Sequence, residues 1–209
     1  MERGEPMNRI RLIFEKRGFA CFVRHVELPQ LFGRIARRAG LQVGLTQGMS
    51  PHPHIVMGPA LPVGVVSQYE TAEIWFESAV TPQEAVEKLN ACAPTGFRFL
   101  KGAHIPADTM SLNKCFDAAK YWLCPRNESR LDAVQSALVE AFAPEVLPWS
   151  ARVSDGIELV MLDPSQNGPG ALVKALIERE LIGGWPDVCI ARLVLGRWKS
   201  EQKEIAPLL

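Results

Sequence analysis

The sequence of 209 residues predicts an α+β fold made of two similar halves. Strand-like runs, in which every second residue is apolar, alternate with segments whose apolar residues recur at helical spacing. The same order of segments occurs twice along the chain, with a join at residues 106–112. The composition, 47% hydrophobic and 22% charged, is that of a globular protein with enough apolar material for a core.

In the first half the clearest element is an amphipathic helix at residues 28–39. Leu28, Phe32 and Ile35 belong to one apolar stripe, and Gly40 marks the end of the helix. A strand is expected before it at 9–14, with a second extended stretch at 19–23. Strands at 71–76 and 97–100 follow, and a helix at 82–91 opens with the capping box Thr81-Pro82-Gln83-Glu84.

The second half is expected to repeat this order. We predict a strand at 115–123, a helix at 128–142 capped by Asn127, a hairpin of 151–153 and 157–162 around Asp155-Gly156, a helix at 171–181, and a strand at 188–195. Each half thus approximates β-α-β-β-α-β, the ferredoxin-like order. We expect tandem ferredoxin-like halves with antiparallel sheets, at residues 8–105 and 112–198.

Charge is unevenly distributed although the net charge is zero. Residues 1–54 hold nine Lys or Arg and four Asp or Glu, whereas residues 55–209 hold fourteen and nineteen. Three of the four histidines lie in the basic part. The five cysteines form no CxxC pair, which favours reduced thiols in a cytoplasmic protein, and neither a signal peptide nor a membrane span is expected.

The most unusual segment is residues 47–54, Gln-Gly-Met-Ser-Pro-His-Pro-His. Its prolines stiffen the backbone, and an extended course would place His52 and His54 on one side. His25 immediately precedes the first helix, whose outer face is basic. We predict one binding surface, although a plain proline-rich connection and a solvated helix face would also explain the pattern. The predicted surface comprises His25, Gln47, Ser50, His52 and His54, flanked by Arg24, Arg34, Arg37 and Arg38.

Other chemistries are less well supported by the residues. His25, His52 and His54 would together supply three imidazoles, a known zinc set, but no carboxylate or cysteine accompanies them at ligand spacing. Ser50 has no nucleophile-elbow context, and the glycines match neither a P-loop nor a dinucleotide fingerprint. We therefore expect no metal and no cofactor on this chain.

Three blocks of the sequence resemble the bacterial radical-SAM-linked protein family, a domain of unknown function. They are Phe14-Glu15-Lys16-Arg17-Gly18, Arg24-His25-Val26-Glu27-Leu28 and Gln47-Gly48-Met49-Ser50-Pro51-His52-Pro53. Arg24, Glu27 and Ser50 replace the family's usual Ser, Asp and Asn. Members are often fused to, or encoded beside, cobalamin-binding radical SAM proteins, so the resemblance implies a radical SAM protein as partner. The CxxxCxxC run of the radical enzymes themselves is absent.

Two functional hypotheses follow. In the first, the chain is an accessory binding module that presents RNA, or docks its partner enzyme, through the basic histidine-bearing surface. In the second it is an RNA-processing enzyme, because CRISPR repeat-processing endoribonucleases look similar in plan and often carry a histidine near the first helix. His25 would then be the catalytic general acid or base.

Overall fold

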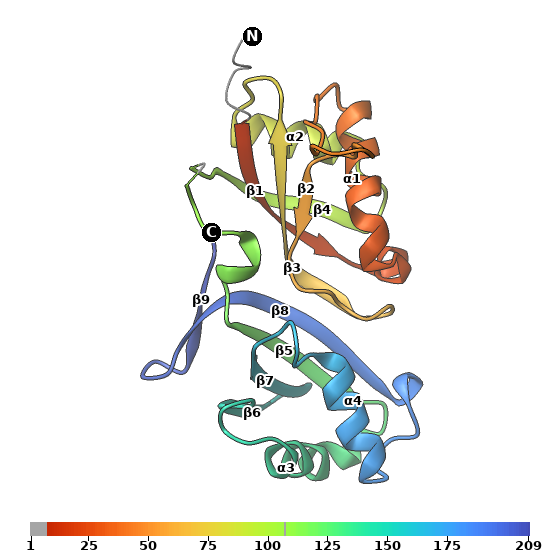
Figure 1. Cartoon of the computed structure of the whole chain (residues 1–209). Helices are drawn as coiled ribbons and strands as arrows, with labels where there is room; N and C mark the ends of the chain where they lie inside the picture. Colours follow the sequence, from red (N-terminus) through yellow and green to blue (C-terminus); the bar gives the residue numbers. More distant parts are fainter. Residues whose placement is uncertain (1–7, 107) are drawn as a thin grey trace. The chain divides into compact units, whose positions relative to one another are not determined.

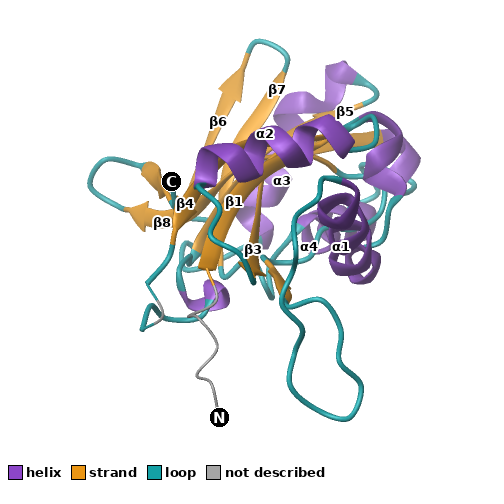
Figure 2. Ribbon diagram, turned by 90° about the horizontal axis from the view of Figure 1, so that it is seen from above, coloured by secondary structure: helices purple, strands orange, loops and turns teal. Residues whose placement is uncertain are grey.

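The computed structural model describes residues 8–106 and 108–209, which fold into two compact units (Figure 1). The first unit comprises the chain up to Gly58, Tyr69–Lys114 and Leu209; the second comprises Pro59–Gln68 and Cys115–Leu208. Among α-helices and strands, the first unit has the order β-α-β-β-α-β, and the second has the same order followed by one more strand. The protein is a mixed α+β structure with four α-helices among the residues described, and its strands pair mostly antiparallel (Figure 2).

The first unit places its strands in the order β4-β1-β3-β2. β1 pairs antiparallel with β4, and β2 pairs antiparallel with β3. The first three residues of β3 belong to the second unit and the rest to the first. The elements are β1 (Asn8–Lys16), α1 (Leu28–Arg38), β2 (Ile55–Met57), β3 (Val66–Phe76), α2 (Pro82–Cys92) and β4 (Phe97–His104).

Every second residue of β1 contributes an apolar side chain to the core of the first unit. Ile10, Leu12 and Phe14 of β1 belong to one buried cluster with the apolar stripes of α1 and α2. Phe14 and Phe32 meet edge to face, with ring centroids 4.9 Å apart. The N-cap half of the expected capping box is confirmed, because the backbone N–H of Glu84 donates to the Thr81 hydroxyl over 3.2 Å, while the Glu84 carboxylate pairs with Lys88.

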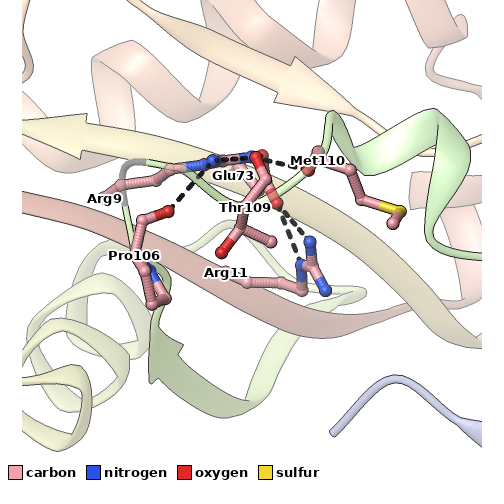
Figure 3. Close-up of polar contacts among 6 residues, drawn as sticks. All are labelled: Arg9, Arg11, Glu73, Pro106, Thr109 and Met110. Atoms are coloured by element: carbon pink, nitrogen blue, oxygen red, sulfur yellow. Dashed lines mark hydrogen bonds and ion pairs between the residues drawn. The ribbon is translucent and has the colours of Figure 1, made fainter.

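Arg9 and Arg11 alternate with the core residues of β1. Together with Glu73 of β3 they form a buried ionic cluster on the other face of the sheet (Figure 3). Arg9 donates from Nε and Nη2 to one carboxylate oxygen of Glu73, over 3.1 and 2.7 Å. Arg11 donates from the same two atoms to the other oxygen, over 2.9 and 2.7 Å. Glu73 is 0% exposed, so one carboxylate removed from water is shared by two guanidinium groups.

Arg9 also fastens the segment that follows β4. Its Nη1 donates to the carbonyl of Thr109 over 3.1 Å and lies 3.5 Å from that of Pro106, and its Nη2 donates to the carbonyl of Met110 over 3.3 Å (Figure 3). Without these bonds the N–H groups of the buried guanidinium would lack acceptors. Each buried N–H group without an acceptor costs about 1–3 kcal/mol. The cluster thus connects β1, β3 and the segment leading out of the first unit.

The second unit has the strand order β8-β5-β7-β6. β9 pairs with the end of β8. Val66 and Ser67 pair in parallel with Ala191 and Arg192 of β8. Alternate residues such as Tyr121, Leu123 and Leu159 are buried with the apolar faces of the helices. The elements are β5 (Ala118–Pro125), α3 (Leu131–Ala141), β6 (Trp149–Val153), β7 (Gly156–Leu162), α4 (Pro169–Glu178), β8 (Val188–Lys199) and β9 (Glu204–Pro207).

Arg192 is a buried cation in the second unit, with an exposure of 0%. Its guanidinium donates to the carbonyls of Pro59 and Ala60 over 2.9 and 3.1 Å, and it lies 5.8 Å from the centroid of the Tyr121 ring. The segment 59–68 therefore packs in the second unit through a charge-assisted hydrogen-bond network.

Two local expectations are wrong. Residues 18–22 form a 3-10 helix rather than the extended stretch expected at 19–23. Ala20 and Cys21 are buried side by side while Phe19 and Phe22 are exposed, a pattern that a strand with alternating faces cannot produce. The strands expected from the sequence also omit β2, which follows α1 at Ile55–Met57.

The five cysteines are free thiols, and among the residues described no helix is both long and apolar enough to cross a membrane. Cys21 and Cys115 are buried, and Cys189 is exposed.

Replacing Glu73 with Gln is expected to lower the free energy of unfolding by about 3–5 kcal/mol, because two buried guanidinium groups lose their shared counter-charge. Urea denaturation followed by circular dichroism measures the change. The matched control is Glu84→Gln, which removes an exposed carboxylate paired with Lys88 and should leave the urea midpoint where it is. An unchanged midpoint for Glu73→Gln would show that the buried cluster does not stabilise the first unit.

Candidate functional site

A pocket of about 620 Å³ opens beside α1 in the first unit. Arg34 and Arg37 project from α1 on one side, and Glu77 lies just beyond the end of β3. We call this the α1 pocket. Its volume lies within the range typical of sites for small molecules or single nucleotides. It is lined by Gln30, Gly33, Arg34, Arg37, Gly40, Leu41, Gln42, Val43, Pro53 and Glu77.

The α1 pocket is closed on one side by Pro53, which belongs to the unusual segment 47–54. A methyl group added at Gly33 would lie 2.9 Å from Cγ and 3.2 Å from Cβ of Pro53. Cβ atoms essentially never come within 3.0 Å of another heavy atom, so glycine allows the proline ring to approach α1 this closely. The segment is thereby packed directly on the arginine-bearing helix.

Residues 43–54 form a hairpin-like excursion, which we call the histidine hairpin. Leu45 and Pro53 form an antiparallel bridge, and the backbone N–H of His54 donates to the carbonyl of Gly44 over 2.7 Å. The backbone N–H of Gly44 in turn donates to the carbonyl of Trp75 over 2.7 Å. The base of the hairpin is therefore joined to β3, while its tip, residues 47–51, is exposed.

The tip is shaped by Gly48 and by the ring of His52. Gly48 has a φ of 137°, in the region that favours glycine. Nδ1 of His52 lies 3.1 Å from the Thr46 hydroxyl and 3.3 Å from the carbonyl of Ser50. The two contacts hold the imidazole beside the turn, with His52 itself exposed to solvent.

His54 lies in a different environment from His52. Its imidazole stacks on Trp75, with ring centroids 3.8 Å apart and planes inclined by 1°. Cζ of Arg9 lies 5.1 Å from the centroid of the same indole. Partial burial lowers the pKa of His54, and the charges of Arg9 and His52 lower it further. The neutral form of His54 is therefore favoured, and its ring adjoins the buried cluster of the first unit through Trp75.

The remaining predicted residues lie around α1. Arg24 forms an ion pair of 2.8 Å with Glu27 in the turn before the helix, and half-buried His25 opens the same turn. Arg38 is exposed in the last turn of α1. The structure thus brings Arg34, Arg37 and Pro53 together in the pocket. The described lining does not include Arg24, His25, Arg38, Gln47, Ser50, His52 or His54.

Sequence reasoning missed several residues of this region. Gln42 and Glu77 line the α1 pocket, and the backbone N–H of Glu77 donates to the carbonyl of Gln42 over 3.0 Å. Trp75 and Glu73 alternate along β3 with buried Ile74, so a polar second face was visible in the pattern. What the pattern lacked was a signal pairing β3 with β1 and the histidine hairpin.

The α1 pocket is suited to a ligand that carries negative charge and hydrogen-bonding edges. Two exposed guanidinium groups three residues apart on a helix suit phosphate or carboxylate oxygens. The side-chain amides of Gln30 and Gln42 both donate and accept, and Glu77 accepts from N–H or O–H groups. Among the described residues no group of three or more His, Cys, Asp or Glu side chains is arranged to hold a metal ion.

Gly33→Ala tests the packing of the histidine hairpin on α1. Alanine ordinarily stabilises a helix interior by up to about 1 kcal/mol relative to glycine. At Gly33 we expect a loss of stability instead, because the new methyl group displaces the Pro53 ring. The matched control is Gly170→Ala in α4, where an added methyl group meets nothing within 4 Å. Thermal melts compare the two variants; a higher melting temperature for Gly33→Ala would contradict the close packing.

His54 should make stability depend on pH. Its pKa is lowered in the folded protein, so protons bind the unfolded chain more readily. The contribution is complete above the ordinary histidine pKa and is lost as the pH falls through that value towards the lowered one. In His54→Phe, which keeps an aromatic ring against Trp75, the loss of stability between pH 7.5 and about 5 should be smaller than in the wild type.

The measurement is the urea midpoint at the two ends of that range, together with the NMR titration of the imidazole protons. Exposed His104, replaced by Asn, serves as the control. Equal pH dependence in the wild type and His54→Phe would show that His54 titrates alike in the folded and unfolded chains.

Two crystal structures are distantly similar to this chain. An unknown protein from Galdieria sulphuraria is 14% identical over 91% of this chain and 100% of its own, with a TM-score of 0.28. The ligand-free regulatory subunit of aspartate kinase from Thermus thermophilus is 15% identical over 82% and 90%, with a TM-score of 0.26. At these TM-scores neither likeness bears on fold or function.

No curated protein matches the sequence. A family does match it, over residues 9–165, which include nearly all of the first unit's strands and helices and the α1 pocket. That family is described as "Uncharacterized protein conserved in bacteria (DUF2344)". The match covers about three quarters of the chain, and the protein therefore belongs to this bacterial family.

Proposed function

We propose that the protein is an accessory binding module that presents RNA to a radical SAM enzyme in the cytoplasm, and that the α1 pocket holds one nucleotide of that RNA. The observation that carries the proposal is the convergence of Arg34, Arg37 and Pro53 on one pocket. Both arginines are exposed, and phosphate oxygens are acceptors that paired guanidinium groups suit well.

The rest of the pocket is consistent with a nucleotide. Glu77 and the amides of Gln30 and Gln42 supply both acceptors and donors for base edges or ribose hydroxyls. The exposed histidine hairpin, with Gln47, Ser50 and His52 near its tip, offers further polar groups beside the pocket. A ligand bound at α1 would therefore extend over the hairpin, and the exposed Arg38 and Arg24 would contact neighbouring phosphates.

We further propose that each unit is ferredoxin-like. The strand orders β4-β1-β3-β2 and β8-β5-β7-β6 both place the first and third strands of a unit at the centre of its sheet. In this plan the helices leave one face of each sheet to other uses. The partnership with a radical SAM protein is proposed from the resemblance of the three N-terminal sequence blocks.

Replacing Arg34 and Arg37 together with Gln should weaken binding of single-stranded RNA roughly ten-fold for each charge-assisted hydrogen bond that is removed. The dependence of log K on log salt should become shallower by about 1.4, the value for two phosphates of a single strand. Fluorescence anisotropy with a labelled oligonucleotide, at several salt concentrations, measures both. The matched control is Arg38→Gln, which removes one exposed arginine from α1 outside the pocket and should have the smaller effect.

His25→Ala separates the binding module from the endoribonuclease. The purified chain is incubated with a total RNA preparation, with and without added divalent metal. A binding module shifts the RNA and leaves it intact whether or not His25 is present. Cleavage that disappears in His25→Ala would replace the proposal by the enzyme hypothesis. RNA that neither shifts nor is cleaved, with the chain captured by its partner enzyme alone, would assign the surface to protein docking.

A further inference from the structure

We infer that Cys124 and Cys189 form a reversible redox pair, which hydroperoxides convert to an intramolecular disulfide. The two residues lie directly opposite each other in the antiparallel ladder of β5 and β8. Side chains opposite each other in such a ladder share a face, with Cβ atoms about 4.5–5.5 Å apart. A disulfide needs about 3.5–4.5 Å, so a small movement of the two strands is sufficient.

The neighbouring pairs fix which face the thiols occupy. Leu123 and Ile190 are the adjacent pair in the ladder, and both are buried in the core of the second unit. The cysteines one residue further along lie on the other face, where Cys189 is exposed and Cys124 half-buried. An oxidant in solution therefore reaches the pair without entering the core.

The ladder holds the pair in register. Pro125 and Val188 are opposite each other on one side, and beyond them the backbone N–H of Arg126 donates to the carbonyl of Asp187 over 2.7 Å. The two thiols are therefore neighbours in every copy of the folded chain, and forming the bond demands no encounter between distant segments. The location near the end of both strands leaves room for the adjustment of the backbone.

The chemistry has a defined order. Exposed Cys189, as the thiolate, attacks the peroxide O–O bond and becomes a sulfenic acid, with hydroxide as the leaving group. Cys124 then attacks the sulfenic sulfur, which releases the second hydroxide and forms the S–S bond. Overall, two thiols and one hydrogen peroxide give one disulfide and two waters. The Cys124 Sγ–H points at the carbonyl of Pro125 at 3.4 Å, so its side chain must rotate before it attacks.

The rate of closure should depend on pH. Burial raises the pKa of Cys124, and the negative charges of Glu128, Cys189 and Asp155 raise it further. Less of this thiol is ionised at pH 7 than is usual for cysteine, so the rate of closure should rise with pH beyond the ordinary thiol range. A cross-strand disulfide under strain is more oxidising than a structural one, so cellular thiols reduce it again.

None of the other three cysteines faces Cys124 or Cys189 in the ladder of β5 and β8. Cys21 and Cys92 belong to the first unit. Cys115 lies before the opposite end of β5, and the strand from Ala118 to Cys124 alone spans about 20 Å at roughly 3.3 Å per residue. The inference is independent of the proposed RNA-binding function, because it concerns only the ladder of the second unit.

The test is oxidation of the purified full-length chain with a molar excess of hydrogen peroxide. The free thiols are counted by alkylation, and the linked peptides are identified by mass spectrometry without reduction. We expect the five thiols to fall to three, with a peptide joining Cys124 to Cys189 and full recovery on adding dithiothreitol. Repeating the reaction at rising pH should show faster closure.

Three variants make the test specific. Cys189→Ser removes the exposed thiol and should abolish the disulfide, while Cys124→Ser should leave Cys189 as a sulfenic acid that a dimedone probe traps. The control, Cys92→Ser, should still form the bond. The inference is overturned if peroxide leaves five thiols, if the product is an intermolecular disulfide, or if Cys189 oxidises alike with and without Cys124.

Discussion

The shared carboxylate of Glu73 is the constraint on which the first unit depends. A single anion removed from water accepts four hydrogen bonds from Arg9 and Arg11, and the cost of burying three charges is recovered only because every hydrogen bond is close and directed. Arg9 also donates to carbonyls of the segment after β4, and its guanidinium lies over the ring of Trp75. A hydrophobic face would hold β1 and β3 together as well, but it would not specify their neighbours.

The histidine hairpin packs against the residues of that cluster on one side and against α1 on the other. His54 stacks on Trp75, which adjoins Arg9, and Pro53 packs on Gly33 of the helix. The two neighbouring residues thus fix the hairpin from two directions, while the tip remains exposed. A rigid base with polar groups at an open tip is suited to recognition, because little order has to be gained on binding.

The two units use the second face of their sheets differently, although the strands follow the same order. In the first unit Arg9, Arg11 and Glu73 occupy it, and all three are buried. In the second unit it carries the exposed Cys189 beside Cys124. Since residues alternate between faces along a strand, the core face can keep its apolar pattern while the other face is free to acquire either a structural cluster or a reactive pair.

The sequence by itself determined most of the elements, because their signals are local. The apolar stripe of α1, the N-cap at Thr81 and the turn at Asp155 each involve residues within a few positions of one another. The composition of residues 47–54 also marked that segment as unusual. Contacts between residues far apart in the sequence could not be recognised in this way. The meeting of Gly33 with Pro53, the sharing of Glu73 by two arginines and the register that sets Cys124 against Cys189 join residues from 20 to more than 60 positions apart. Periodicity tells which face a side chain occupies, but only the pairing of strands and the packing of helices decide what it meets there.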